Sequence, residues 1–130
     1  MTTKVSTVSG TKRLAKNSKL LKVIIQAIQD KKGVNILSLD LRKISEAAAD
    51  FFIICEADST TQVKAIADNI EEQTALQLSE KPYRIEGRAQ LHWVLVDYIN
   101  VVIHIMLPEV RRRYRLEELW NDAAEQKFEN

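Results

Sequence analysis

Two segments of the chain carry apolar residues at the spacing of an amphipathic helix. The first follows Asn17 and Ser18, either of which can cap it, and ends at the sequence Lys31-Lys32-Gly33, a cationic turn followed by a glycine stop. Its apolar stripe consists of Leu21, Ile24, Ile25 and Ile28. The second follows Ser59, which forms a capping box with Gln62, and it extends for roughly 20 residues. Its inward face consists of Val63, Ile66, Ala67, Ile70 and Thr74.

Three segments between these helices and after them have the patterns of strands. Residues 34–41 alternate Leu37, Leu39 and Leu41 with polar residues, which indicates a strand with one solvated face. Residues 51–55 are apolar without alternation, as in a strand buried on both faces. Residues 83–86 follow the second helix, so the strand, helix and strand predict a right-handed crossover between two paired parallel strands.

The last part of the chain predicts an antiparallel hairpin and a helix. Residues 93–96 and 101–105 are rich in β-forming side chains and are separated by a short break. Pro108 closes the second strand. A final helix then carries one stripe of Leu116, Leu119, Trp120, Ala123 and Lys127. Together the elements predict a single α/β domain with a mixed five-stranded sheet and flanking helices.

Composition adds an uneven distribution of charge. The 130 residues, 45% hydrophobic and 28% charged, are enough for one domain with a core. Residues 1–29 hold six basic side chains and no acidic one, whereas the rest of the chain has a net charge of −5. Residues 1–17 read as a flexible basic tail ahead of a domain at 18–130. A solvated tail, an organelle transit peptide and an arm on RNA phosphate remain alternatives for it.

Several classes of protein do not fit the sequence. The longest apolar run, residues 101–107, is far shorter than the roughly 20 residues that span a bilayer, so we expect no membrane partner. No apolar segment follows the first basic residues, which argues against a secretory signal. A single cysteine, Cys55, excludes internal disulfides, and two separated histidines are too few for a structural zinc site.

The turn after residues 51–55 is the first candidate for chemistry, because ligands of α/β sheets bind at the carboxyl ends of strands. It has no glycine to form a phosphate cradle. Glu56 and Asp58 could share Mg²⁺, but Asp58 and Ser59 are also ordinary helix-capping residues. Cys55 ends a buried strand, where a thiol is inert, and no base accompanies it. We therefore predict no catalytic residues, no metal and no cofactor.

Five other polar residues have structural interpretations. His104 alternates with Ile103 and Ile105, so we expect a hydrogen-bonded histidine on the opposite face of the sheet from them. His92 is expected at the surface. Residues 111–113 are three arginines near the start of the predicted last helix, where the helix dipole disfavours cations. A partner or a buried acid would explain them.

Trp93, Asp97 and Tyr98 are the candidate binding residues. Rigid aromatic side chains beside a carboxylate have the composition of a protein-binding hot spot. The physics of the sequence leaves open whether these aromatics are exposed for a partner or simply pack.

Three sequence signatures resemble the ribosomal silencing factors of the RsfS/Iojap family. The first is formed by residues 49–55, Ser59, Gln62-Val63 and residues 65–68. The second is Glu86-Gly87, residues 93–98 and residues 101–105. The third is Arg111, Tyr114, Leu116-Glu117 and residues 119–123. Their order and spacing are specific, and the resemblance extends over almost all of the chain from Ser18 to Ala123.

The resemblance implies a binding protein with a nucleotidyltransferase-like fold and no catalysis. Its members bind protein number fourteen of the large ribosomal subunit, block joining of the small subunit and repress translation under nutrient limitation. They self-associate as homodimers when free. By this resemblance Trp93 and Tyr98 are aromatic anchors, Asp97 supplies charge nearby, RNA contact is incidental and the location is the bacterial cytoplasm. The acidic body suits a basic ribosomal partner. A nucleotidyltransferase-like enzyme and an RNA-binding module are the alternatives.

The sequence departs from the family pattern at Ala57 and Ile99, where glycine is common. A β-branched residue resists positive φ, so we expect the hairpin turn at residues 97–100 to be longer or of another type, with Asn100 in the left-handed conformation.

Overall fold

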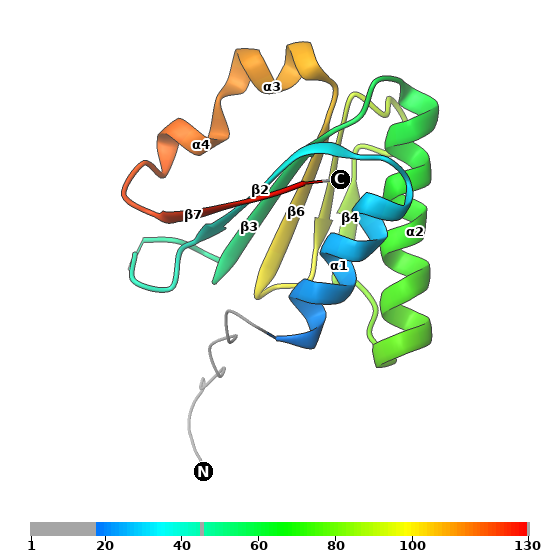
Figure 1. Cartoon of the computed structure of the whole chain (residues 1–130), viewed down its shortest axis with the longest axis horizontal. Helices are drawn as coiled ribbons and strands as arrows, with labels where there is room; N and C mark the ends of the chain where they lie inside the picture. Colours follow the sequence, from blue (N-terminus) through cyan, green and yellow to red (C-terminus); the bar gives the residue numbers. More distant parts are fainter. Residues whose placement is uncertain (1–17, 45, 130) are drawn as a thin grey trace.

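The computed structural model describes residues 18–44 and 46–129, which form an α/β domain around a mixed sheet (Figure 1). Within these residues the sheet has six strands in the order β4-β5-β6-β3-β2-β7. The strands are β2 (Val34–Asp40), β3 (Phe51–Glu56), β4 (Arg84–Glu86), β5 (Trp93–Asp97), β6 (Val101–Met106) and β7 (Ala124–Phe128). The helices are α1 (Lys19–Asp30), α2 (Thr60–Leu78), α3 (Pro108–Tyr114) and α4 (Leu116–Leu119). The predicted α/β class and mixed sheet are confirmed, but five strands was wrong.

The pairing of the strands differs from the sequence prediction at one place. β3 is parallel to β6, with Phe51 opposite Val101, and every other pair is antiparallel. The sequence predicted that the crossover through α2 joins two paired strands, but β3 and β4 are not paired. The β5–β6 hairpin inserts between them, because β4 pairs with β5 and β6 takes the place beside β3. Local pattern finds such strands but does not fix which neighbour each one takes.

The two long helices begin at the predicted caps. The Ser18 hydroxyl accepts a hydrogen bond from the Leu21 amide, and that of Ser59 accepts one from the Gln62 amide. The Gln62 side chain accepts from the Asp58 amide, one residue before the position expected for a capping box. Its amide group also donates to the carbonyls of Lys31 and Lys32, which ties the end of α1 to the start of α2.

Gly33 was predicted to stop α1, and the helix does end before it, but the residue with the positive φ, of 66°, is Lys32. Gly33 is required for space instead, since a Cβ there would lie 2.5 Å from the Ile28 Cγ2.

The sheet has a separate apolar core on each face. α1 and α2 cover one face and pack on alternate strand residues such as Ile53, Val96 and Ile103. The other face carries a smaller cluster, centred on Leu39, Ile54 and Met106, against which residues of α3, α4 and the segment after them pack. Figure 1 shows α1 and α2 together on one side of the sheet and α3 and α4 away from them. We call the face beneath α3 and α4 the second face.

The predicted final helix is interrupted after Tyr114 and is wrong beyond Leu119, where α4 ends. Arg115 adopts a left-handed conformation with φ of 49°, which ends α3 and starts the short α4. The chain then turns and residues 124–128 pair with β2 instead of continuing as a helix. The backbone of β2 would otherwise be unpaired along this edge, so strand formation satisfies groups that a helix would leave to solvent. Lys127, placed on the inward stripe by the sequence, is exposed.

The hairpin turn also differs from its prediction. Ile99, not Asn100, has the positive φ, of 74°. The Asp97 Oδ1 accepts a hydrogen bond of 2.7 Å from the Ile99 amide, and the Tyr98 amide donates to the Val101 carbonyl at 2.8 Å. These bonds hold a β-branched residue in a conformation that its side chain disfavours. The Ile99 side chain is 55% exposed, which removes any packing clash.

Candidate partner-binding site

The structure places Trp93 and Tyr98 on opposite faces of the sheet. Trp93 is half-buried and packs with the apolar cluster of the second face. Tyr98 is only 9% exposed and belongs to the core beneath α1 and α2. Of the two alternatives that the sequence left open, Tyr98 therefore packs in the core and is not exposed for a partner.

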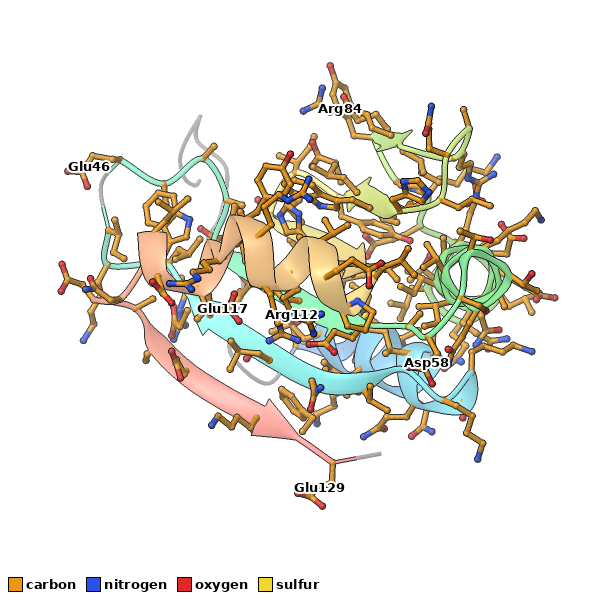
Figure 2. The ribbon with its side chains drawn as sticks, turned by 90° about the horizontal axis from the view of Figure 1, so that it is seen from above. Glu46, Asp58, Arg84, Arg112, Glu117 and Glu129 are labelled. Atoms are coloured by element: carbon orange, nitrogen blue, oxygen red, sulfur yellow. The ribbon has the colours of Figure 1, made fainter. Side chains whose placement is uncertain are left out.

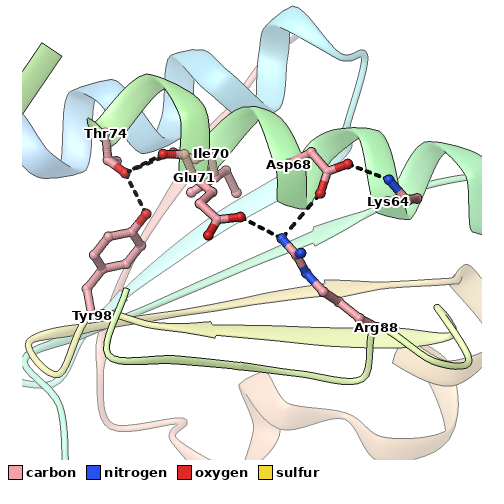
Figure 3. A network of polar contacts seen from close by, with 7 residues as sticks. All are labelled: Lys64, Asp68, Ile70, Glu71, Thr74, Arg88 and Tyr98. Carbon is pink, nitrogen blue, oxygen red and sulfur yellow. Dashed lines mark hydrogen bonds and ion pairs between the residues drawn. The ribbon is translucent and has the colours of Figure 1, made fainter. Parts of the chain in front are cut away.

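Tyr98 is held beneath α2 by a buried hydrogen bond. Its hydroxyl lies 2.7 Å from Oγ1 of the fully buried Thr74, which also donates to the Ile70 carbonyl at 3.0 Å (Figure 3). Burial raises the pKa of Tyr98. Closer to solvent, Arg88 bridges Asp68 and Glu71 of α2 at 3.2 and 2.7 Å. These contacts join α2 to the segments on either side of β5.

Asp97 is committed to contacts within the chain. One of its carboxylate oxygens accepts from the Ile99 amide, and the other lies 3.2 Å from Nε of Arg84, which also pairs with Glu86 at 2.6 Å. Asp97 therefore shapes the turn, and Arg84 balances the carboxylate charge that Asp97 was expected to offer a partner.

Trp93 lies in an aromatic cluster on the second face. The centroid of its ring is 5.0 Å from that of Tyr114 and 5.8 Å from that of His104. Phe52 extends the cluster, with its ring centroid 4.9 Å from that of His104 and 6.1 Å from that of Trp120. We call Phe52, Trp93, His104, Tyr114 and Trp120 the aromatic cluster.

The exposed edge of the cluster includes a residue that sequence reasoning did not place in a site. Tyr114 is 51% exposed beside the half-buried Trp93. The two residues are far apart in the chain and meet only because α3 folds back over β5 and β6. Tyr114 carried one signal in the sequence, its place in the third signature. Together they present two rigid rings to solvent, the side-chain types that dominate protein-binding hot spots.

His104 is the buried member of the cluster and is 5% exposed. As expected, it faces away from Ile103 and Ile105, and its Nδ1 accepts a hydrogen bond of 3.0 Å from the Trp93 indole Nε1. Its Nε2 has no hydrogen-bond partner within the described residues. Desolvation by burial lowers the pKa of His104 to about 4, so the ring is neutral near pH 7.

Arg111 has acidic partners, as its unusual position suggested, and both are partly buried. It is almost buried between Glu56, at 3.3 Å, and Glu117, at 3.0 Å, and it also donates to the Asn35 carbonyl. The arginines lie in the last turn of α3, not near the start of a long helix, so the dipole favours them. Arg111 thus joins α3 and α4 to the ends of β2 and β3.

The turn at residues 56–58, considered above as a magnesium site, uses its Glu56 carboxylate for contacts within the protein. The two carboxylate oxygens of Glu56 contact Arg111 and the Asn35 side-chain amide, while Asp58 lies exposed at the cap of α2 (Figure 2). Residues 18–44 and 46–129 contain no group of three or more potential metal ligands. Cys55 is fully buried, and burial raises the pKa of its thiol to about 12, as in an unreactive cysteine.

A groove of about 940 Å³, lined by both charged and apolar residues, lies between the β2–β7 edge and α3 and α4. Arg112 and Glu117 line it (Figure 2), together with residues of both charges from β7. Its charges are mixed, so it favours neither an anion nor a cation. In the part of the chain that the structure describes, no helix is long and apolar enough to cross a bilayer.

The best-formed candidate site of this α/β domain is a pair of neighbouring aromatic side chains, Trp93 and Tyr114, the kind of site that protein-binding modules use. The model of the family "Ribosomal silencing factor during starvation" matches residues 14–130. The chain therefore belongs to the ribosomal silencing factor (RsfS) family, as its signatures predicted.

Individual relatives agree with this assignment. The chain is 39% identical over 107 residues to the ribosomal silencing factor RsfS of Halalkalibacterium halodurans, covering 82% of this chain and 90% of the relative. It is 38% identical over 73 residues to the mouse "Mitochondrial assembly of ribosomal large subunit protein 1", covering 55% of this chain and 32% of that protein. The crystal structure of protein CV0518 from Chromobacterium violaceum superposes with a TM-score of 0.74 at 36% identity, over 79% of this chain and 84% of that one.

Proposed function

We propose that this protein binds the large ribosomal subunit through its protein number fourteen and sterically blocks joining of the small subunit, which represses translation under nutrient limitation. The observation that carries the proposal is the contact between the half-buried Trp93 and the exposed Tyr114 on the second face. Membership of the silencing-factor family supports the ribosome as the target. The name of the mouse relative, which refers to assembly of the large subunit, supports that subunit in particular.

Recognition divides into a long-range and a short-range part. The net charge of −5 from residue 30 onward attracts a basic ribosomal protein and raises the rate of encounter. At contact, the rings of Trp93 and Tyr114 bury apolar area with little loss of side-chain entropy. Blocking requires no chemistry, only the bulk of the domain on the surface that the small subunit would occupy, so we propose a role without catalysis or cofactor.

Of the three residues expected at the interface, Trp93 is the one that we propose to contact the partner directly. Asp97 and Tyr98 act indirectly, by fixing the end of the strand that carries Trp93. Asp97 closes the turn after β5, and Tyr98 anchors that turn to α2. We further propose that the free protein is a homodimer in the bacterial cytoplasm, that RNA contact is incidental, and that the fold is nucleotidyltransferase-like. The organelle alternative depends on residues 1–17, which lie outside the described residues.

The test is co-sedimentation of the purified protein with large subunits, followed by a subunit-joining assay. Trp93→Ala should weaken binding by on the order of 2 kcal/mol while circular dichroism shows a folded protein. Tyr83→Ala is the matched control, because Tyr83 is a 72% exposed tyrosine just before the β4 edge strand. Wild-type protein that leaves subunit joining unaffected, or a folded Trp93→Ala variant that binds as wild type does, would contradict the proposal.

A further inference from the structure

His104 has a buried polar atom that the fold alone does not explain. The residue is 5% exposed, and Nε2 has no hydrogen-bond partner among the described residues. A buried histidine that serves only packing costs more than a phenylalanine of similar size, because an unsatisfied ring N–H loses its hydration without compensation. Within the described residues, the one hydrogen bond that the ring forms is the bond that its Nδ1 accepts from Trp93.

The direction of that hydrogen bond fixes the state of both rings. The indole Nε1–H of Trp93 can only donate, so Nδ1 of His104 must present a lone pair at 3.0 Å. The proton of neutral His104 is then on Nε2, which is the atom without a partner. Desolvation keeps the pKa of His104 low and so preserves this neutral form near pH 7.

We infer that His104 is a positioning residue that holds the Trp93 indole in one orientation for partner binding, an inference that rests on the proposed function. Three contacts restrain the indole: the hydrogen bond to His104, the His104 ring at 5.8 Å and the Tyr114 ring at 5.0 Å between centroids. The indole N–H is directed into the protein. The partner therefore meets an apolar, π-rich surface of Trp93 and forms no hydrogen bond with its nitrogen.

This arrangement predicts the chemistry on the partner side. A ring surface without a free donor is matched by aliphatic side chains or by the cation of a lysine or arginine. A partner carbonyl or carboxylate would gain nothing at this position. Preorganisation of the indole also reduces the side-chain entropy that is lost on binding.

Two substitutions separate positioning from packing. His104→Phe keeps a ring but removes the acceptor, and it also removes the unsatisfied Nε2–H, so the melting temperature at pH 7 should change little. His104→Asn places its Oδ1 where Nδ1 stood and so keeps an acceptor for the indole. We expect His104→Phe to weaken large-subunit binding about fivefold to tenfold, the equivalent of one lost hydrogen bond, and His104→Asn to restore most of that loss.

The orientation is measured independently of the ribosome by NMR on ¹⁵N-labelled protein. In wild type, the Trp93 Nε1 resonance should show scalar coupling across the hydrogen bond to His104 Nδ1, and its proton should exchange slowly with solvent. Trp120→Phe identifies which of the two indole signals belongs to Trp93. The coupling should disappear in His104→Phe.

The outcomes distinguish the inference from the proposed function. If wild type binds large subunits, Trp93→Ala does not, and His104→Phe binds as wild type does, the positioning role is overturned and the proposed function stands. Absence of the coupling in wild type also overturns it. If wild type fails to bind although the coupling is present, the proposed function fails and the docking role of His104 fails with it.

Discussion

Acidification should destabilise this protein through His104 at a pH higher than that at which most of the protein's carboxylates become protonated. The folded pKa is about 4 against an ordinary value of 6.5, and burial is the cause. A histidine with a lowered folded pKa contributes its full stability above pH 6.5 and loses it as the pH falls toward 4, because the unfolded chain binds the proton first. Protonation would also set a second N–H against the Trp93 indole donor.

The size of the effect follows from that pKa difference. Each unit is worth about 1.4 kcal/mol, so the free energy of unfolding should fall by about 2 kcal/mol between pH 7 and pH 5, and by about 3 kcal/mol at pH 4. Other groups titrate over the same range, so the quantity to measure is the difference between wild type and His104→Phe. Both are unfolded with urea at half-unit steps of pH.

The result expected is a difference in unfolding free energy that shifts by about 2 kcal/mol in favour of His104→Phe as the pH falls from 7 to 5. Parallel curves for the two proteins over this range would refute the reasoning. They would mean that water or a structural change solvates His104 and that it titrates as an ordinary histidine.

Three further predictions use urea unfolding at pH 7. Arg111→Met should cost about 2 kcal/mol, because it leaves two partly buried carboxylates without their cation; a loss below 1 kcal/mol would show that these groups are solvated. Tyr98→Phe should cost about 1 kcal/mol through the bond to Thr74, and no loss would contradict the buried hydrogen bond. Ile99→Gly should stabilise the protein by about 1 kcal/mol by relieving the positive φ, and destabilisation would show that the turn conformation is wrong.

The sequence predicted elements wherever local pattern and tertiary environment agree. Both long helices, the strands β2 and β3 and the β5–β6 hairpin follow from apolar spacing and capping residues. Each of these elements buries its apolar face where the pattern puts it. β7 was missed because its residues are mostly exposed, and its pairing depends on β2 having a free edge. No local pattern in residues 124–128 carries that information.

Placing Tyr98 at the same interface as Trp93 was an error of another kind, because the spacing of the two residues in the sequence already argued against it. Trp93 and Tyr98 are five residues apart, an odd separation, and the period of two along a strand places such residues on opposite faces. Asp97, four residues from Trp93, is on the same face by that rule. Tyr114 could not have been placed beside Trp93 from spacing, because their contact depends on the path of α3.

The two faces of the sheet differ in how they are stabilised, and the difference bears on function. The face under α1 and α2 is covered by helices of 12 and 19 residues over a large apolar cluster. The second face is covered by helices of 7 and 4 residues, held by the Arg111 ion pairs and the aromatic cluster. Short helices with few buried residues open at lower free energy than the core. We therefore expect the second face to open more readily than the opposite face, which would let it adjust to the proposed partner while the opposite face preserves the fold.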